Sequence, residues 1–533
     1  MALSKREVIF FAIIALVFFA TRFWGILDFP IFNDESLYLQ YSELIHDDFS
    51  GYKYISVGNV YNDWKPPLQY WLGALAIDIS ENPLFSGRIV SVLFSFVGLL
   101  GVYLLARNLY GKKEAVIAAG LFTVSSLTLF YNTQFVAETF VFSSGALFFA
   151  LTLAAIKQED ARGKTCFAAG AIITGAALLL LKQSGALYLF LSAALPLIAL
   201  QKNSEGDEVG GISRKNKKPF LKNIAAVAII IIFSFVIYKL AIPGEFWASK
   251  QEFTSRWAMT ATEIFSFPLE TWRQNAVQVS DIFSHYYSWA ALVIVLIFTI
   301  RGVAKRDMRD TIVSLLWLGG TVAVLFLLKG VNEYVYHTAT IPFLIIIMAR
   351  VAAHVLEYVK KRTGIIWKTV TIVLGILCLY TIAFWIYQTA LIKISPIKYL
   401  EQSTDWAKSA YLTGWSSGFG VPEVVDFLKK TEGDGIIITD SQWGNPGTAI
   451  QVFHRYWYQN IAVFPLLVDF FDERFRARLK TLDVKRRFFI FSDWVSEDSE
   501  RSEWYHIVKN EFCLEEKEFA PYDGQIPIAV CSF

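Results

Sequence analysis

Long apolar segments recur along most of this chain, and they restrict its fold more than any other feature. The first runs from Val8 to Leu27, and further segments follow at intervals until residue 388. Most of them approach the roughly 20 residues that an α-helix needs to cross the hydrocarbon core of a bilayer. Hydrophobic residues make up 55% of the 533 residues and charged residues only 18%, which is unlike a soluble globular protein. We therefore predict a polytopic α-helical membrane protein.

The spans and their orientation follow from length and from the basic residues of the loops. We expect about eleven spans, at 8–27, 87–107, 114–131, 135–156, 165–182, 184–200, 223–242, 286–300, 312–329, 338–356 and 366–388. Lys5 and Arg6 precede the first span, which predicts a cytoplasmic N-terminus. The apolar segment 66–80 is too short to cross, so we expect an interfacial or re-entrant helix there. With that choice the basic loops return to the cytoplasm and the C-terminus lies outside.

The basic linker at 202–222 is rich in glycine and serine, with nothing folded around it, so we expect no nucleic-acid partner. Beyond Thr389 the composition becomes polar enough for a soluble domain outside the membrane, and residues 1–389 and 390–533 form the two expected domains. Strand and helix patterns alternate in the second, which favours a small α/β fold. We expect strands at 435–440, 487–492 and 526–531, and helices at 421–428 and 472–482.

Two features of this second domain are open to more than one interpretation. Cys513 and Cys531 either form a disulfide in an oxidising exterior or remain two unpaired core cysteines, and the sequence favours neither. The segment 440–447 is dense in turn-forming residues, and ligand loops do occupy such strand ends. We nevertheless expect an ordinary surface turn there.

A pair of carboxylates follows the first span and opens an amphipathic helix. Asn33 suits the N-cap, and acidic residues in the first turn favour the helix dipole, so capping alone is one explanation of Asp34 and Glu35. Adjacent helical positions point about 100° apart, so at most one of the two faces a given substrate. Asp34 and Glu35 are both candidate catalytic residues, and Asp34 is preferred because it shares its face with Tyr38 and Tyr41, which would flank a sugar.

Cations and a third acidic residue are expected at the same outer level of the membrane. Lys65 stands before Pro66 and Pro67, either as an interfacial anchor or as a cation at the membrane surface. Glu138, Lys182 and Arg88 lie near the outer ends of three spans. Snorkelling would explain each base separately, but acidic and basic residues gathered at one level indicate a shared polar cavity.

Tyr336 and His337, at the outer start of the span 338–356, would join this cavity. A single histidine is more often a structural residue than a ligand, so the alternative for His337 is a satisfied structural role. The outer loop 28–86 and the ends of these spans thus form the candidate site.

These motifs resemble those of GT-C membrane glycosyltransferases, especially the family 39 protein mannosyltransferase-like enzymes and the lipid A aminoarabinose transferase. The resemblance covers approximately residues 1–390 and rests on Asn-Asp34-Glu35, Lys65-Pro-Pro-Leu-Gln-Tyr-Trp, Gly87-Arg88-Ile, Ala106-Arg-Asn-Leu-Tyr-Gly111, Leu181-Lys182-Gln-Ser-Gly and Tyr336-His-Thr-Ala-Thr-Ile-Pro342. It implies an inverting transfer of a sugar from a polyprenyl- or dolichyl-phosphate donor on the non-cytoplasmic face, to a protein, lipid or glycan acceptor.

The resemblance also implies roles for individual residues. Asp34 becomes the base or the acceptor-orienting acid, and Lys65, Arg88 and Lys182 become partners of the donor phosphate. Glu138 takes the place of a second acidic residue. Some GT-C enzymes use a divalent metal such as Mg or Mn and others do not, so Asp34 and Glu138 are the expected ligands if a metal is used.

Two other functions fit a membrane protein of this kind. A transporter or flippase for a lipid-linked saccharide would show internal repeats and broken helices at the bilayer midplane. No repeat is evident in this sequence, and its ionisable residues gather at the outer edge. The other function is that of a membrane-anchored binding module in which residues 390–533 form the functional domain.

Overall fold

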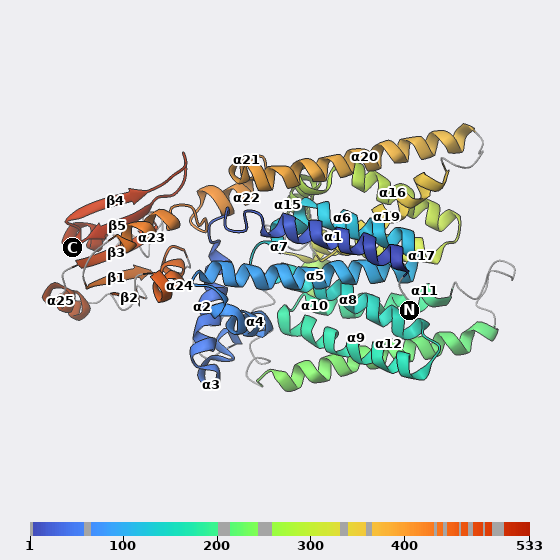
Figure 1. Cartoon of the computed structure of the whole chain (residues 1–533), viewed down its shortest axis with the longest axis horizontal. Coiled ribbons are helices and arrows are strands. Elements are labelled where there is room, and N and C mark those ends of the chain that lie inside the picture. The colour runs from blue at the N-terminus through green and yellow to red at the C-terminus, as the bar shows by residue number, and fades with distance from the viewer. Residues whose placement is uncertain are drawn as a thin grey trace.

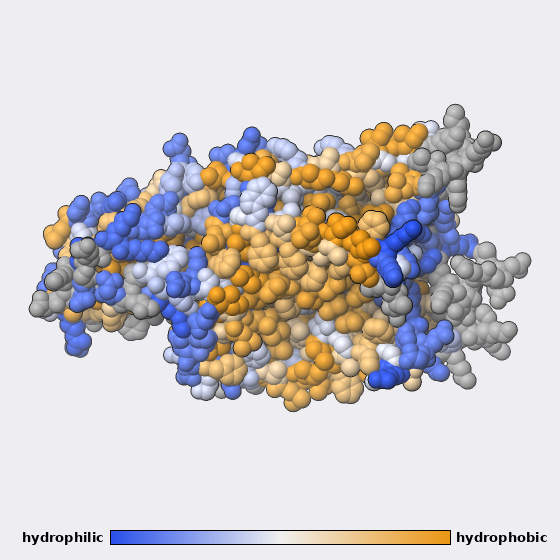
Figure 2. Space-filling view, in the orientation of Figure 1, coloured by the Kyte–Doolittle hydropathy of each residue, from blue (hydrophilic) through white to orange (hydrophobic). Residues whose placement is uncertain are grey.

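The computed structural model describes residues 4–57, 65–200, 214–243, 258–330, 339–358, 365–440, 445–457, 460–466, 473–482, 486–492 and 506–533. The described chain forms a long helical bundle with a smaller α/β domain at one end (Figure 1). A hydrophobic band covers the middle of the bundle, and hydrophilic residues lie at both of its ends (Figure 2). This distribution is the one expected of a protein that spans a bilayer.

The bundle is built mainly from long apolar helices. Its described helices are α1 (Lys5–Phe23), α5 (Pro83–Leu109), α6 (Lys112–Val124), α7 (Ser126–Asn132), α8 (Ala137–Lys157), α9 (Ala161–Leu181), α10 (Gly185–Leu191), α11 (Leu195–Leu200), α12 (Arg214–Ala241), α16 (Trp289–Ala304), α17 (Met308–Leu327), α19 (Ile341–Tyr358) and α20 (Ile365–Ile394). By length and composition, six of the described helices suffice to cross a membrane, or eight if two bent pairs each count as one span. The chain is thus a multi-pass membrane protein, and the number eleven stays a prediction.

The helix α8 forms the centre of the bundle, and 83% of its most apolar stretch is buried. It packs between α5 and α9. Gly101 allows the close approach to α5, because a Cβ atom there would lie 2.5 Å from the backbone nitrogen of Leu147. Small residues at helix contacts are the usual means of tight packing in membranes, where apolar burial alone gives little driving force.

Short helices outside the bundle complete its end near the α/β domain. They are α2 (Asn33–Asp47), α3 (Phe49–Tyr52), α4 (Leu68–Ala76), α14 (Ala261–Phe265) and α15 (Leu269–Ile282). The segment predicted at 66–80 contains α4 followed by a single 3-10 turn, Ile77–Ile79, and it packs against α2. The helix α4 is therefore short, as the sequence predicted, and it supports α2 by packing against it.

The C-terminal domain is a mixed sheet with helices. Its five described strands lie in the order β2 (Ile461–Leu466), β1 (Gly435–Asp440), β3 (Arg486–Ser492), β5 (Ile528–Ser532) and β4 (Glu515–Phe519). The first three are parallel, whereas β5 is antiparallel to both β3 and β4. Its described helices include α23 (Val421–Lys429), α24 (Gly447–Trp457) and α25 (Glu473–Thr481), and the short helices α21 (Pro396–Glu401) and α22 (Asp405–Lys408) connect it to α20. The predicted α/β character is confirmed.

Periodicity explains why α23 forms where it does. Val421, Val424, Val425 and Leu428 recur at helical spacing and are all buried, while Pro422 suits the first turn. The helix α20 continues to Ile394, so the membrane helix passes the expected domain boundary at residue 389 by less than two turns.

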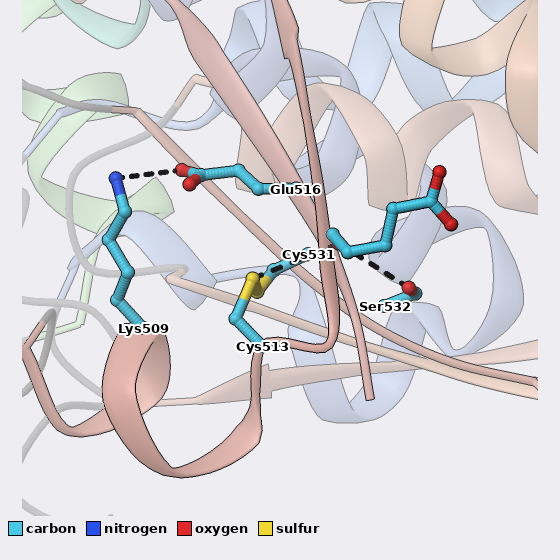
Figure 3. Close-up of a disulfide and its surroundings, with 6 residues drawn as sticks. Lys509, Cys513, Glu516, Cys531 and Ser532 are labelled. Atoms are coloured by element: carbon cyan, nitrogen blue, oxygen red, sulfur yellow. Dashed lines mark hydrogen bonds and ion pairs between the residues drawn. A yellow bond between two sulfur atoms is a disulfide. The ribbon is translucent and has the colours of Figure 1, made fainter.

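A disulfide joins Cys513 and Cys531, whose Cα atoms lie 5.3 Å apart (Figure 3). It ties the start of β4 to β5, and an ion pair of 3.0 Å between Lys509 and Glu516 lies beside it. Of the two alternatives that the sequence left open, the structure therefore shows the disulfide.

Candidate active site

The helix α2 begins at Asn33, and its first turn carries the two carboxylates singled out from the sequence. The N-cap is Phe32, so the prediction of Asn33 as the cap was wrong by one residue. The Glu35 side chain reaches back to accept a hydrogen bond of 3.3 Å from the Phe32 backbone nitrogen. This bond satisfies one of the donors that a helix leaves free at its start.

Glu35 and Arg88 form a buried ion pair between α2 and α5. Arg88 Nε and Nη2 donate to the two oxygens of Glu35 at 3.0 and 2.6 Å. Arg88 also donates to the carbonyls of Ile26, Phe29 and Pro30. A guanidinium group has five N–H donors, so all of them are used within the described structure.

The other contacts of Glu35 join the outer loop to the bundle. Its Oε1 also accepts a hydrogen bond of 2.7 Å from the backbone nitrogen of Phe135, in the turn before α8. The Glu35 and Arg88 side chains are 0% and 1% exposed. Both had been predicted as site residues, Glu35 for catalysis and Arg88 for the donor phosphate. The geometry instead favours a structural role for the pair, because each charge already has a complete set of partners.

Asp34 points in a different direction from Glu35 and is partly exposed. Its Oδ2 accepts a hydrogen bond of 3.0 Å from the hydroxyl group of Tyr38, one helical turn later. The ammonium group of Lys65 lies 4.8 Å from the centre of the Tyr38 ring. The candidate carboxylate and the candidate cation therefore contact the same tyrosine, one at its hydroxyl and one at its face.

Tyr41 was expected to flank a sugar, but it is 1% exposed and packs against the ring of Tyr70. Tyr38 also contacts Tyr70, at 5.4 Å between ring centroids. These rings form the packing between α2 and α4 and hold the Asp34 face of the helix in place. Tyr41 was thus a core residue that helical spacing alone had placed beside the site.

Hydrogen bonds fix the segment that carries Lys65. The hydroxyl group of Ser56 donates to the Lys65 carbonyl at 2.7 Å, and Gln69 donates to the Phe135 carbonyl at 3.0 Å. The same turn before α8 therefore binds both Glu35, through its N–H, and Gln69, through its C=O. The carboxylate pair and the Lys65-Pro-Pro segment are thereby held against one point of the bundle.

Glu138 and Lys182 form a second ion pair, between the first turn of α8 and the C-cap of α9. The pair lines a cavity of about 200 Å³ whose other walls are mainly apolar and come from α10, α17 and the start of α19. Its lining residues are Glu138, Val141, Lys182, Ser184, Leu187, Gly320, Ala323, Val324, Leu327, Leu328, Ala339 and Thr340. An apolar cavity with one charge pair at its edge suits a ligand that has both a charged group and a hydrocarbon chain.

Tyr336 and His337, the remaining predicted site residues, lie outside the described residues. Within the described residues, no group of three or more His, Cys, Asp or Glu side chains is arranged to hold a metal. Of the two expected metal ligands, Asp34 binds a tyrosine hydroxyl group and Glu138 binds the cation Lys182. This arrangement does not fit a preformed metal site, and we assign no chemical step to a metal.

One neighbour of the site, the C-terminal domain, was not expected from the sequence. Its residue Asn445 is buried, and its backbone nitrogen donates to Asn33 Oδ1 at 2.7 Å. The Asn445 side chain donates to the Ile31 carbonyl at 3.0 Å. The prediction of an ordinary surface turn was therefore wrong for this end of the segment 440–447. The density of turn-forming residues was a signal of the loop but not of its burial.

The helix α24 continues this contact along α2. Ser36 and Gln40 on α2 hydrogen bond to Thr448 and Gln451 on α24. Near the end of α2, Arg455 forms an ion pair with Asp47 at 2.6 Å. The C-terminal domain therefore holds the helix that carries Asp34 along most of its length.

Burial raises the pKa of Glu43, which lies between these contacts on α2, well above its usual value. The positive charge of Arg455 opposes this shift, whereas Asp47 and Asp78 add to it. Such surroundings favour the neutral form of a carboxyl group over the charged form.

Comparisons with known proteins agree with the resemblance found in the sequence motifs. The family model of dolichyl-phosphate-mannose-protein mannosyltransferase matches residues 64–238. No curated protein sequence matches the chain. The structure of ArnT from Cupriavidus metallidurans bound to undecaprenyl phosphate is similar over 99% of this chain and 98% of that chain, with 12% identity and a TM-score of 0.52.

The apo state of the same ArnT is similar over 98% of this chain and 97% of that chain, again with 12% identity and a TM-score of 0.52. The archaeal oligosaccharyltransferase AglB from Archaeoglobus fulgidus, in complex with an inhibitory peptide and a dolichol-phosphate, gives 13% identity and a TM-score of 0.47 over 95% of this chain and 71% of that chain. The ArnT likeness shows a shared fold. With the family match, it confirms the resemblance to GT-C enzymes.

Proposed function

We propose that the protein is an inverting glycosyltransferase that moves a sugar from a polyprenyl- or dolichyl-phosphate donor to an acceptor on the non-cytoplasmic face of the membrane. One observation carries the proposal. Asp34, a partly exposed carboxylate, shares Tyr38 with Lys65 at the end of the bundle where the Glu138–Lys182 pair lines an apolar cavity. ArnT, whose fold is similar, was solved with undecaprenyl phosphate, which favours a polyprenyl-phosphate donor here.

In the proposed reaction, Asp34 accepts a proton from the acceptor hydroxyl or amine group. The acceptor atom then forms a bond to the anomeric carbon as the bond from that carbon to the phosphate oxygen breaks. The electron pair leaves with the lipid phosphate, and attack from the opposite face inverts the anomeric configuration. The hydrogen bond from Tyr38 fixes the position of Asp34, and positive charge stabilises the departing phosphate.

We assign the lipid phosphate to Lys65 and Lys182. Lys182 binds Glu138 in the described structure, and a donor phosphate would compete with that carboxylate for the ammonium group. The apolar walls of the cavity beside it suit the first isoprene units of the lipid. Glu35 and Arg88 then act only by holding α2 against α5. Residues 1–389 form the transferase domain, and residues 390–533 form an extracytoplasmic domain.

The location of the C-terminal domain agrees with its chemistry. Disulfides persist in oxidising compartments, and the domain carries the disulfide between Cys513 and Cys531. It lies at the same end of the bundle as α2 and α4 (Figure 1). This agrees with a site outside the cytoplasm, and the acceptor would approach between the domain and the membrane.

The test is transfer by Asp34→Asn in membranes supplied with purified donor lipid. Loss of a general base should lower kcat by about 10²–10⁴-fold, with little change in the thermal stability of the protein. The matched control is Asp48→Asn, which neutralises another carboxylate of the outer loop that only caps α3. Turnover retained by Asp34→Asn, or lost equally by Asp48→Asn, would refute the assignment.

A second experiment tests the phosphate contacts. Lys65→Ala and Lys182→Ala should each raise the apparent donor KM by about tenfold or more, because each removes one charge-assisted contact, and acceptor KM should change less. Lys53→Ala, a lysine of the same loop, serves as the control. Unchanged donor KM in both variants would show that the phosphate binds elsewhere.

A further inference from the structure

A second candidate ligand site lies at the other end of the bundle, far from Asp34. It is a crevice of about 50 Å³ between α16, α19 and α20. Its lining residues are Ile297, Phe298, Arg301, Lys305, Val351, His354, Val355, Val370, Thr371 and Leu374. Most of these side chains are apolar, and the three basic ones come from α16 and α19.

The two cations of the crevice come from the end of one helix. Arg301 lies in the last turn of α16 and Lys305 is its C-cap, so their side chains share a face of the helix. Among the described residues, neither has a hydrogen-bonding or ion-pair partner for its side chain. On α19, His354 Nε2 is buried and also lacks a hydrogen bond. Three polar groups at one crevice are therefore available to a ligand.

Two nearby carboxylates, Asp307 and Asp310, form their hydrogen bonds and ion pairs with groups other than Arg301 and Lys305. Asp307 accepts hydrogen bonds from the first backbone nitrogens of α17. Asp310 lies 3.9 Å from Arg350, which also binds Glu114 at 2.6 Å. The excess positive charge of the crevice is thus left beside Arg301 and Lys305.

A simpler explanation is that cations favour the C-terminal end of a helix and extend to the membrane surface. That explanation accounts for Arg301 and Lys305 but not for the apolar walls or for the unsatisfied His354. The wall residue Val370 on α20 is 37% exposed, so the crevice opens on the outer surface of the bundle, where lipid would lie. A ligand that fits has an anionic head and an apolar chain.

We propose that this crevice binds an anionic phospholipid of the leaflet opposite to the active site. Its phosphate contacts Arg301, Lys305 and His354, and an acyl chain lies along Val370 and Leu374. Basic pockets between membrane helices are known to recognise such headgroups. The site is separate from the donor lipid, whose proposed contacts are at the other end, and it does not depend on the proposed activity.

The experiment is native mass spectrometry of the full-length protein released from nanodiscs that contain equal amounts of phosphatidylglycerol and phosphatidylcholine. One phosphatidylglycerol should stay bound to the wild type. In Arg301→Ala/Lys305→Ala its affinity should fall by about 30-fold, since each basic residue near a lipid headgroup contributes a factor of about five. The control Arg162→Ala/Lys164→Ala removes the same charge from the start of α9, outside the crevice, and should keep the lipid.

Equal retention of phosphatidylcholine, or an equal loss in the control variant, would overturn the proposal. Inorganic phosphate provides a further arm. Displacement of the lipid by millimolar phosphate would mean that the crevice is a general anion site, which would also overturn it. The folded state of each variant is checked in the same spectrum by its charge-state distribution, and His354→Gln gives a second variant with no change in net charge at neutral pH.

Discussion

Replacing Glu35 with alanine should destabilise the protein much more than replacing its neighbour Asp34. Arg88 is 1% exposed and directs two of its five N–H donors at Glu35. Glu35→Ala leaves that charge buried with only backbone carbonyls as partners. Breaking a buried ion pair on one side costs about 3–5 kcal/mol. Asp34 is partly exposed, and among the described residues its side chain has one hydrogen bond, from Tyr38, so Asp34→Asn should cost no more than about 1 kcal/mol.

Thermal unfolding of the detergent-solubilised protein measures this difference. Tryptophan fluorescence is a suitable signal, because the chain has 16 tryptophans. A partner variant sharpens the test. Glu35→Leu/Arg88→Met removes both charges and should regain part of the lost stability, since apolar replacements of a buried pair are often tolerated. Recovery should be incomplete, because the carbonyls of Ile26, Phe29 and Pro30 lose their donor.

The reasoning fails if Glu35→Ala unfolds at the wild-type temperature but has no transferase activity. That result would make Glu35 a catalytic residue and Arg88 its activator. It also fails if Asp34→Asn unfolds as early as Glu35→Ala, since the two carboxylates would then share one structural role.

Three further predictions concern the C-terminal domain and its contact with α2. Asn445→Ala should destabilise the protein by about 1–3 kcal/mol, because the buried Ile31 carbonyl loses its donor. It should also lower kcat without changing donor affinity, and an unchanged kcat would contradict this prediction. Burial raises the pKa of Glu43 above 4.5, so as pH rises above that value the unfolded chain loses this proton before the folded protein does, and the free energy of unfolding should fall. Glu43→Gln should flatten this part of the curve of stability against pH, and an unchanged curve would contradict the reasoning. Cys513→Ser/Cys531→Ser should cost about 3 kcal/mol for a loop of 18 residues; an unchanged unfolding temperature would show that the disulfide does not constrain the chain.

The hydrophobic pattern correctly predicted a helical multi-pass membrane protein, because a span must be long and apolar whatever it packs against. The break between α6 and α7, a bend of 63°, was not expected. Ser125 stands at that break, and no glycine or proline marks it. The carbonyls at the break bind distant side chains, since Arg22 donates to the Thr123 carbonyl at 2.6 Å and Thr389 donates to the Val124 carbonyl at 3.0 Å. No local pattern reveals such tertiary contacts.

In the C-terminal domain the strand β1 was predicted at its exact bounds, 435–440, because a run of isoleucines between turn residues reads clearly as a buried strand. The helix α24 and the strands β2 and β4 were missed. The strand β4, Glu-Glu-Lys-Glu-Phe, lies at the edge of the described sheet and is mostly exposed, so it lacks an apolar signal. Pairing with β5 rather than composition makes it a strand.

Within the site, the candidate residues were easier to predict than the contacts that they make. The sequence brought Asp34 and Lys65 forward, and the structure places them on one tyrosine. It could not show that Arg88 binds Glu35, because the two lie 53 positions apart and either was equally suited to a ligand. Nor could it show that Asn445 reaches α2, since contacts across 412 positions leave no local trace.

The most direct test of the central claim is mass spectrometry of the lipids that copurify with the protein. If Asp34 is the base of a transfer from a lipid phosphate, Asp34→Asn should retain a polyprenyl-phosphate sugar that the wild type converts to free polyprenyl phosphate. The mass of the retained lipid would also identify the sugar. If neither preparation holds a polyprenyl phosphate above the level found with an unrelated membrane protein, the chain does not use such a donor.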